Sequence, residues 1–240
     1  KYDILLIMQP FKVLLIISIF YSCSNKLVYY KKERYEGLYS HKHHQSQYVK
    51  YTINKRDILG ATNRVDNYEI DYEVDSTVSF HYYYKSGFDR GHLKPAASSK
   101  ACDEDMKSSF LFTNISPQVP DFNRKGWRFI ETKTRDILNN YDSIIVYSGP
   151  VLKRFRNKKL KNSEITIPKH FFKAIYINDS IAFGFICPNK KLDKNVFKYL
   201  VSIDEIERLI HQDLFVGLNN EVEAKIDTAF IISKVFRYKS

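Results

Sequence analysis

The chain is poor in cysteine, with three among 240 residues, and none of them forms a Cys-x-x-Cys pair. This lack argues against a zinc knuckle or a dithiol redox motif. Cys102 and Cys187 could pair in an oxidising compartment or remain as two buried thiols, and the sequence leaves both options open. The chain also lacks internal repeats and low-complexity blocks, which argues against a repeat array.

The apolar run near the N-terminus, Val13–Tyr21, is too short to cross a membrane, which takes about 20 residues. A short apolar run that ends in a small residue and Cys23 is typical of a signal peptide and resembles a bacterial lipoprotein cleavage site. We therefore expect residues 1–23 to be a leader, with Met8 as the start and Cys23 as the lipidation site. The protein would then be exported, either lipid-anchored in the bacterial cell envelope or secreted or periplasmic. A buried N-terminal strand or helix is the alternative.

Acidic residues are outnumbered, with 27 Asp and Glu against 38 Lys and Arg, a net charge of +11. Such a surface favours polyanionic partners, whether nucleic acid, acidic polysaccharide or an anionic membrane. Basic residues concentrate within 153–161, and this run is either a track for a phosphate backbone or a solvated loop. A hydrophobic content of 44% indicates a globular chain.

The length suits one domain, at roughly 100–200 residues per domain. We assign residues 24–47 to a polar linker and residues 48–240 to that domain. Within the linker, His41, His43 and His44 could bind a metal, but a solvated histidine-rich loop is the stronger interpretation.

Hydrophobic periodicity divides the domain into strands and helices. Alternating or apolar runs predict strands at Val49–Ile53, Phe110–Phe112, Ser143–Tyr147, and a hairpin of Glu164–Ile177 with Ile181–Cys187. Helical spacing predicts helices at 101–109, from about Asn123 to Asn140, and at 203–215 after a Ser202–Glu205 capping box. The mixture predicts an α+β fold with a mixed, largely antiparallel sheet flanked by helices.

Residues 86–97 form the first segment with clear chemical potential, because they contain Asp89-Arg90-Gly91-His92. The planar fork of Arg90 suits a phosphate, to which it can donate two hydrogen bonds at once. His92 can accept a proton from water near neutral pH, and a neighbouring arginine discourages its charged form. Gly91 between them allows a close approach of a ligand. Alone, such a basic tripeptide is more often plain surface.

Residues 113–131 form the second segment, which offers oxygen donors to a hard cation such as Mg²⁺. Asn123 falls near the start of the predicted helix, and Glu131 lies about two turns further on. Helical side chains lean toward the N-terminus, so we expect Glu131 to hold a metal-bound water rather than the ion itself. The alternative is that Asn123 only caps the helix and Glu131 is solvated.

Together these segments resemble the DNA/RNA non-specific endonuclease family, which includes mitochondrial endonuclease G and secreted sugar-non-specific nucleases. The resemblance rests on the order of three motifs, Asp89-Arg90-Gly91-His92, Thr113-Asn114…Pro117-Gln118 and Asn123…Trp127…Glu131. Weaker likeness extends over most of residues 48–215. Ser98 departs from the aspartate found in many members, and Lys94 replaces a commoner apolar residue.

The resemblance implies a ββα-metal (His-Me finger) active-site motif. In that motif His92 would act as general base, and Asn123 would bind Mg²⁺, for which Mn²⁺ can substitute. Glu131 would position the water shell of the metal. Arg90 would contact the scissile phosphate, and Asn114 would support the geometry of the catalytic set.

Two further residues are candidates for substrate binding. Lys94 lies two residues after His92, and Arg64 stands where some family members place an upstream arginine, although the alignment there is poor. The resemblance also implies DNA and RNA as substrates and, because family members are often dimers, a homodimer. The leader implies a membrane contact only through a lipid on Cys23.

The expected function is therefore a metal-dependent endonuclease that cuts DNA and RNA without sequence specificity. A site that grips phosphate and metal reads no base edges, and base contacts are what specify sequence. Two alternatives remain open, an exported nucleic-acid-binding protein with an inactive site, and a phosphodiesterase acting on small phosphodiesters. The intact motifs argue against the first, and the charge of +11 argues against the second.

Overall fold

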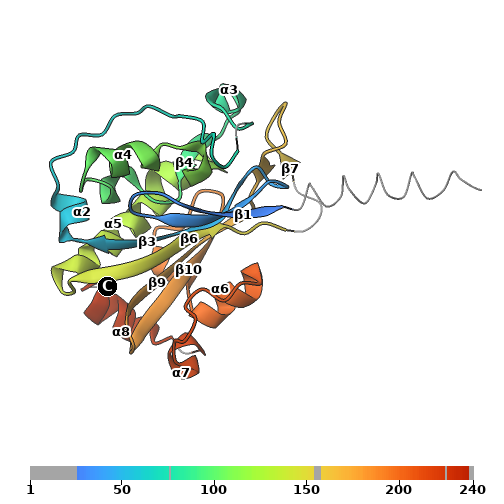
Figure 1. Cartoon of the computed structure of the whole chain (residues 1–240). Coiled ribbons are helices and arrows are strands. Elements are labelled where there is room, and N and C mark those ends of the chain that lie inside the picture. The colour runs from blue at the N-terminus through green and yellow to red at the C-terminus, as the bar shows by residue number, and fades with distance from the viewer. Residues whose placement is uncertain (1–25, 76, 154–157, 225, 238–240) are drawn as a thin grey trace, which may run out of the picture.

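The computed structural model describes residues 26–75, 77–153, 158–224 and 226–237 (Figure 1). Within them, a seven-stranded sheet has the order β1-β2-β3-β6-β9-β10-β11, and all its neighbouring strands are antiparallel. Its strands are β1 (Leu27–Lys31), β2 (Glu36–Ser40), β3 (Gln45–Asn54), β6 (Ser143–Pro150), β9 (His170–Asn178), β10 (Ile181–Pro188) and β11 (Leu200–Val201). This arrangement confirms the predicted α+β fold with a largely antiparallel sheet.

The helical elements flank this sheet on two sides (Figure 1). The α-helices are α2 (Lys55–Leu59), α3 (Phe80–Tyr83), α4 (Asp103–Ser109), α5 (Arg128–Asp136), α6 (Ile203–Ile210), α7 (Asn220–Ala224) and α8 (Thr228–Phe230). The 3₁₀ and π segments are η1 (Ala96–Ser98), η2 (Phe112–Asn114), η3 (Phe122–Trp127), η4 (Ile137–Asn139), η5 (Val196–Tyr199) and η6 (Ile231–Val235). Among the described residues, no helix is long and apolar enough to cross a membrane.

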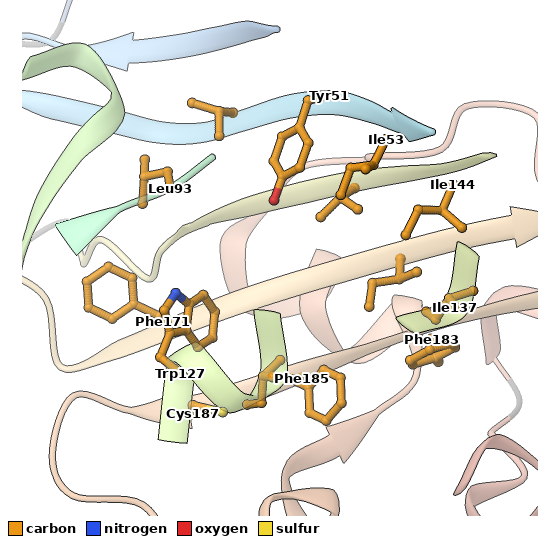
Figure 2. Close-up of a cluster of buried hydrophobic side chains, with 14 of the residues drawn as sticks. Tyr51, Ile53, Leu93, Trp127, Ile137, Ile144, Phe171, Phe183, Phe185 and Cys187 are labelled. Carbon is orange, nitrogen blue, oxygen red and sulfur yellow. The ribbon is translucent and has the colours of Figure 1, made fainter. Parts of the chain in front are cut away.

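Strand β9 shows how the sheet serves two cores. Phe171 and Ile175 join the large core that includes Trp127 of η3, whereas Phe172 and Ala174 face the smaller core under α6. This alternation is the period of two that a strand imposes on its side chains. Trp127 lies against Phe171 with ring centroids 6.1 Å apart (Figure 2). The helix that follows β5 is thereby packed onto the sheet.

Strands β1 and β2 lie within residues 26–47, where we expected a polar linker, so the structure corrects that expectation for these residues. Tyr30, Tyr35 and Tyr39 of this segment bury their rings while their hydroxyls keep hydrogen-bond partners, whereas Tyr29 is exposed. Tyr35 donates to the carbonyl of Ser108 at 2.8 Å, and Tyr39 donates to Asp75 at 2.7 Å. Tyrosine therefore supplies apolar core area in a stretch whose composition is otherwise polar.

The histidine-rich turn between β2 and β3 is not the solvated loop that we expected. His43 is buried, and its Nδ1 lies 2.9 Å from the hydroxyl of Thr166. His44 lies 3.1 Å from Asp75, which accepts hydrogen bonds from several neighbours. The burial of His43 lowers its pKa to about 4. This turn is a structural junction between the sheet and the segment that follows α2.

A ββα unit lies beside the main sheet. Strand β4 (Asp89–His92) pairs antiparallel with β5 (Ile115–Gln118), with Asp89 opposite Gln118 and His92 opposite Ile115. Residues 122–139 then form one helical stretch, as predicted for 123–140, but it begins as the π-helical η3 and ends as the 3₁₀ segment η4. The expected ββα architecture is confirmed in these residues. Across the pair, Gly91 leaves room for the side chain of Gln118, which a Cβ would meet at 2.1 Å.

Three predicted elements differ most clearly from those of the structure. Phe110 and Phe112 are buried as expected, but Phe110 follows the last residue of α4 and Phe112 begins η2, so the segment is not a strand. The hairpin begins at His170 rather than Glu164, because Pro168 cannot donate a ladder hydrogen bond, and Thr166–Ile167 (β8) pairs instead with Lys158–Lys159 (β7). The last predicted helix ends at Ile210, where His211 turns left-handed with φ of 57°.

Two expectations involved cysteines: the open question of a Cys102–Cys187 disulfide, and the lipidation of Cys23. Cys102 and Cys187 are both free thiols in the structure, and burial raises the pKa of Cys187 above its ordinary range. Cys23, the expected lipidation site, and the rest of residues 1–23 lie outside the described residues.

Candidate active site

Asp89 joins the first motif to the start of the helix. Its Oδ2 accepts a hydrogen bond from Asn123 Nδ2 at 3.0 Å, and both carboxylate oxygens accept from Arg124, at 2.8 and 2.6 Å. A carboxylate only accepts, so it fixes the amide of Asn123 with its nitrogen toward Asp89. The Asn123 Oδ1 atom is left to face another donor or a cation, and no residue in the described part of the chain donates to it.

His92, at the end of β4, sits among aromatic rings. Its imidazole lies 4.8 Å from the Phe110 ring and 5.7 Å from the Tyr68 ring. The Nε2 atom is buried without a hydrogen-bond partner in the described structure. Burial, assisted by the charges of Arg64 and Arg90, lowers the pKa of His92 to about 3. The neutral form, which can accept a proton, therefore dominates throughout the physiological range.

Arg90 is oriented by aromatic faces. Its guanidinium lies 4.2 Å from the centre of the Tyr68 ring and 4.5 Å from that of Phe80. Both distances are within the range of a cation–π contact. None of the ion pairs found among the described residues includes Arg90. Its charge is therefore held in place without being neutralised by a carboxylate, which suits a phosphate-binding group.

Arg64 lies in the same region despite its poor sequence alignment. Its guanidinium is 5.3 Å from the Phe110 ring, and its Nε donates to Asp66 at 2.6 Å. The charge of Arg64 lowers the pKa of both His92 and Glu131. The tertiary structure thus brings this residue toward the two predicted catalytic side chains.

Glu131 lies in the first turn of α5, where burial raises its pKa and four cations oppose that rise. The strongest of the four is Lys173 of β9, whose ammonium donates to Ser148 at 3.2 Å and to Tyr51 at 3.3 Å. The same ammonium lies 4.9 Å from the centre of the Trp127 ring. Lys173 is fully buried, and burial lowers its pKa to about 8. Sequence reasoning did not single out this lysine, because its burial depends on the sheet.

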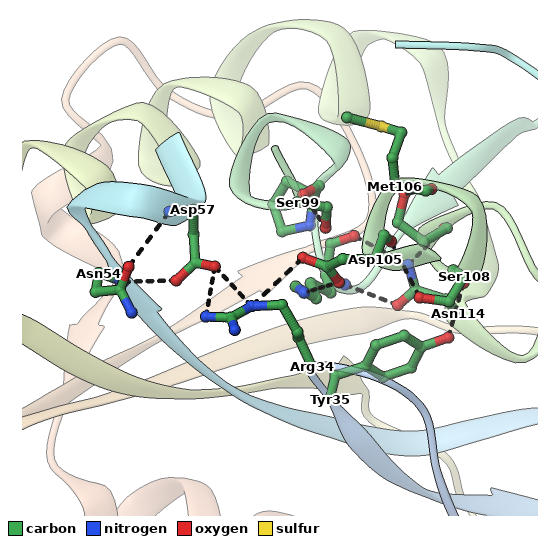
Figure 3. Close-up of polar contacts among 12 residues, drawn as sticks. Arg34, Tyr35, Asn54, Asp57, Ser99, Asp105, Met106, Ser108 and Asn114 are labelled. Carbon is green, nitrogen blue, oxygen red and sulfur yellow. Dashed lines mark hydrogen bonds and ion pairs between the residues drawn. The ribbon is translucent and has the colours of Figure 1, made fainter. Parts of the chain in front are cut away.

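Asn114 is a structural support rather than a group that can touch substrate. It is fully buried, its Oδ1 accepts from the Lys94 amide at 2.8 Å, and its Nδ2 donates to the carbonyls of Lys94 and Ser109. These bonds tie the chain that leaves β4 to the end of α4, where Asn114 and Ser108 are seen together (Figure 3). The predicted role of Asn114 in the geometry of the catalytic set stays a prediction.

Lys94 is the one predicted substrate contact that the structure does not support. Its side chain is only 1% exposed, and its ammonium forms an ion pair with Asp105 of α4. Asp105 in turn lies 3.9 Å from Arg34, and Figure 3 shows these two residues facing each other. A lysine held in a buried ion pair cannot reach a phosphate in solvent. The lysine is an internal counter-ion in this chain.

A cavity of about 490 Å³ brings part of the predicted site together. Its lining includes Arg64, Asp89, Arg90 and Asn123, together with aromatic side chains from the segment 68–88. His92 is not among the lining residues and adjoins the cavity through Tyr68. The arrangement offers cations to an anionic ligand and a free amide oxygen to a metal ion, with a neutral imidazole beside them.

The donor set at Asn123 fits a hydrated hard cation. It offers one free amide oxygen, and Mg²⁺ commonly keeps several waters while taking few protein ligands. A full protein cage is not offered there, because the only group of three acidic, histidine or cysteine donors among the described residues is Asp204, Glu207 and Glu223, in α6 and α7. Asn123 therefore has an oxygen that could serve a hydrated cation as a single protein ligand.

Comparisons with known proteins identify a family and similar chains. A profile of the DNA/RNA non-specific endonuclease family matches residues 17–221, a range that includes the segment holding β1 and β2. A nuclease from Nostoc sp. is 28% identical over 213 residues, covering 82% of this chain and 76% of that protein. Human mitochondrial endonuclease G is 28% identical over 166 residues, covering 60% of this chain and 55% of that protein.

A solved structure shows the same fold. The crystal structure of an EndoG/EndoGI complex superposes with a TM-score of 0.74 at 19% identity, covering 91% of this chain and 96% of that chain. At 19% sequence identity, this similarity shows a shared fold and nothing about the reaction. Taken with the match over residues 17–221, the ββα unit and its motif residues lead to one conclusion: the chain belongs to the DNA/RNA non-specific endonuclease family.

Proposed function

We propose that the protein is a metal-dependent endonuclease that hydrolyses phosphodiester bonds in DNA and RNA without reading base sequence. As a member of its family the chain is a nuclease, and the finer assignments rest on the site. The observation that carries the proposal is the Asp89–Asn123 hydrogen bond, which holds an amide oxygen beside Arg90 in one cavity.

Each side chain has a distinct part in this proposal. His92, neutral because it is buried, takes the proton from the attacking water. Arg90, stacked between two rings and free of carboxylates, binds the phosphate. Asn123 would hold Mg²⁺ with Glu131 orienting its water, and when bound the metal stabilises negative charge that develops on the phosphate oxygens.

The same arrangement supports loose substrate choice. Phosphate and metal contacts position a nucleic acid without reading the donor and acceptor pattern of its bases. The basic balance of the chain, +11, supports binding to any polyanion of this kind. We extend the proposal to export through the N-terminal leader with Cys23 as the lipidated residue, and to a homodimer.

A plasmid assay tests the proposal. Supercoiled DNA and a folded RNA are each incubated with the protein in Mg²⁺, in Mn²⁺ and in EDTA. Cleavage of both with either metal and none in EDTA is expected. His92→Ala should slow cleavage by about 10²–10⁴-fold, the range for loss of a general base. His81→Ala, which removes an exposed histidine of α3, is the matched control and should cleave normally.

Two outcomes would contradict the proposal. Binding of plasmid without cleavage under every metal condition would favour an inactive nucleic-acid-binding protein. Hydrolysis of bis-p-nitrophenyl phosphate with none of DNA or RNA would favour the small-phosphodiester alternative.

A further inference from the structure

Two exposed aromatic rings line the same cavity as Arg90 and Asn123. Phe80 begins α3 and is 48% exposed, and Tyr84, the residue after α3, is 61% exposed. Their ring centroids lie 6.5 Å apart with an interplanar angle of 33°. Two flat apolar faces are therefore partly open to solvent beside the group proposed to bind phosphate.

Core packing does not account for these rings. The short helix is already anchored by Tyr83, which is buried and stacks on Phe112 with centroids 5.9 Å apart. Val78, just before the helix, is buried in the same cluster. Because Tyr83 and Val78 supply the contact area, Phe80 and Tyr84 are not required to hold α3 in place.

The charges around the rings indicate what kind of molecule would cover them. The cavity lining contains Arg64, Lys85, Arg90 and Arg124, against only Asp66 and Asp89. Asp89 is already paired with Arg124, and Asp66 with Arg64. Lys85 and Arg90 remain on the aromatic side, with the Lys85 ammonium 5.2 Å from the Tyr84 ring centre.

We propose that Phe80 and Tyr84 form a stacking subsite for an unpaired nucleobase next to the phosphate bound by Arg90. A planar ring attached to an anionic backbone matches exposed aromatic faces bordered by cations. A base within a duplex has its faces covered by its neighbours, whereas an unpaired base can offer a face. The subsite therefore favours single-stranded or locally melted nucleic acid.

This subsite rests on the proposed nuclease function and is compatible with loose sequence choice. Every base has a π-face, so stacking on an aromatic side chain tolerates all four bases. The subsite would distinguish single-stranded from double-stranded nucleic acid, and it would do so without hydrogen bonds to the edges of the bases. Tyr84 is the better residue to test, because Phe80 also supports the guanidinium of Arg90 at 4.5 Å.

The test measures binding in EDTA, where cleavage is not required. A fluorescent single-stranded 12-mer of thymidines and an abasic 12-mer with the same backbone charge are titrated with the wild type, Tyr84→Ala and Tyr84→Phe. Tyr72→Ala is the control, because Tyr72 is 77% exposed and lies outside the cavity lining. The wild type should bind the thymidine 12-mer more tightly than the abasic one.

Tyr84→Ala should weaken binding of the thymidine 12-mer by about 5- to 100-fold and leave abasic binding unchanged. Tyr84→Phe, which keeps the flat ring, should bind like the wild type, as should Tyr72→Ala. In Mg²⁺, Tyr84→Ala should also lose more activity on the single strand than on a duplex of the same sequence. The thermal midpoints of the variants report whether they are folded.

Three results would overturn the subsite. They are equal affinity of the wild type for the two 12-mers, equal losses on both with Tyr84→Ala, and a Tyr84→Ala protein that binds normally but changes from dimer to monomer. The last result would assign the rings to a protein contact. Failure of the nuclease proposal is a separate observation, the absence of metal-dependent cleavage by the wild type.

Discussion

Asp89 and Asn123 lie 34 residues apart in the chain and are joined by a hydrogen bond of 3.0 Å. One belongs to β4 and the other to η3, so this bond connects the strand and helix sides of the ββα unit. Asp89 also pairs with Arg124 through both oxygens. The carboxylate is thus a positioning group that sets which atom of Asn123 is available to a cation.

Replacing Asp89 should weaken metal binding. In Asp89→Asn the partner of Asn123 can donate as well as accept, so the amide is no longer held in one orientation. We expect the Mg²⁺ concentration for half-maximal cleavage to rise about 10–100-fold, the usual effect of losing a group that orients a metal ligand. Asp121→Asn removes a carboxylate that is 48% exposed and pairs with Lys125 at 2.7 Å, and it should leave that concentration unchanged. Equal effects in both variants would rule out the orienting role.

Lys173 should affect the pH profile through Glu131. Burial raises the pKa of Glu131, and Lys173 is the strongest of the charges that lower it. Lys173→Met removes this charge, so the pKa of Glu131 rises further. If Glu131 acts as a carboxylate, the acid limb of kcat/KM moves to higher pH. Lys191→Met, at an exposed lysine, is the control. An acid limb that stays in place or moves to lower pH would exclude this coupling.

Lys94 should matter for stability rather than for substrate affinity. Lys94→Met removes the hydrogen-bonded counter-ion of the buried Asp105 and leaves only Arg34, 3.9 Å away. Losing one partner of a buried ion pair typically costs on the order of 3–5 kcal/mol of unfolding free energy. Adding Asp105→Leu removes the carboxylate and should restore much of that loss. Lys107→Met, at an exposed position of α4, is the control in urea unfolding experiments. A Lys94→Met protein of normal stability with a raised KM would instead return Lys94 to the substrate site.

His43 should make the fold sensitive to acid. Burial lowers its pKa to about 4 from an ordinary value of 6.5. Between these values the unfolded chain takes up a proton that the folded chain does not, so stability falls as pH drops from 6.5 to 4 and this contribution then levels off. The difference of about 2.5 pKa units corresponds to a fall of up to about 3.5 kcal/mol, at about 1.4 kcal/mol per unit. It should be smaller in His43→Asn and unchanged in His81→Asn, measured by urea unfolding at several pH values. An identical fall in all three proteins would contradict it.

The sequence pattern was enough to predict the features that depend on residues close together in the chain. The Asp89-Arg90-Gly91-His92 segment and the helix that carries Asn123 are each contiguous, so residue type and helical spacing could identify them. The α4 helix and the β9–β10 hairpin were likewise predictable from periodicity and turn residues. These features depend on neighbours within a few residues, and such neighbours are visible in the sequence.

Features that depend on residues far apart in the chain could not be predicted from the sequence pattern. A linker and an edge strand have similar polar composition, and β1 and β2 are distinguished by tyrosine rings that find partners far along the chain, such as Ser108 and Asp75. The same limit applies to Arg64, whose approach to His92 and Glu131 appears only in three dimensions. The burial of His43 against Thr166 also depends on residues far apart in sequence.

By itself, the sequence determined the family motifs, the α+β class and the order of the catalytic candidates, because these follow from residue type and spacing along one chain. Only the tertiary structure decided that Lys94 is an internal counter-ion, that Lys173 lies near Glu131, and that the rings of Phe80 and Tyr84 stay exposed. The physical reason is that burial and charge pairing depend on which distant segments pack together. A lysine or an aromatic ring looks the same in sequence whether it faces the core or the solvent.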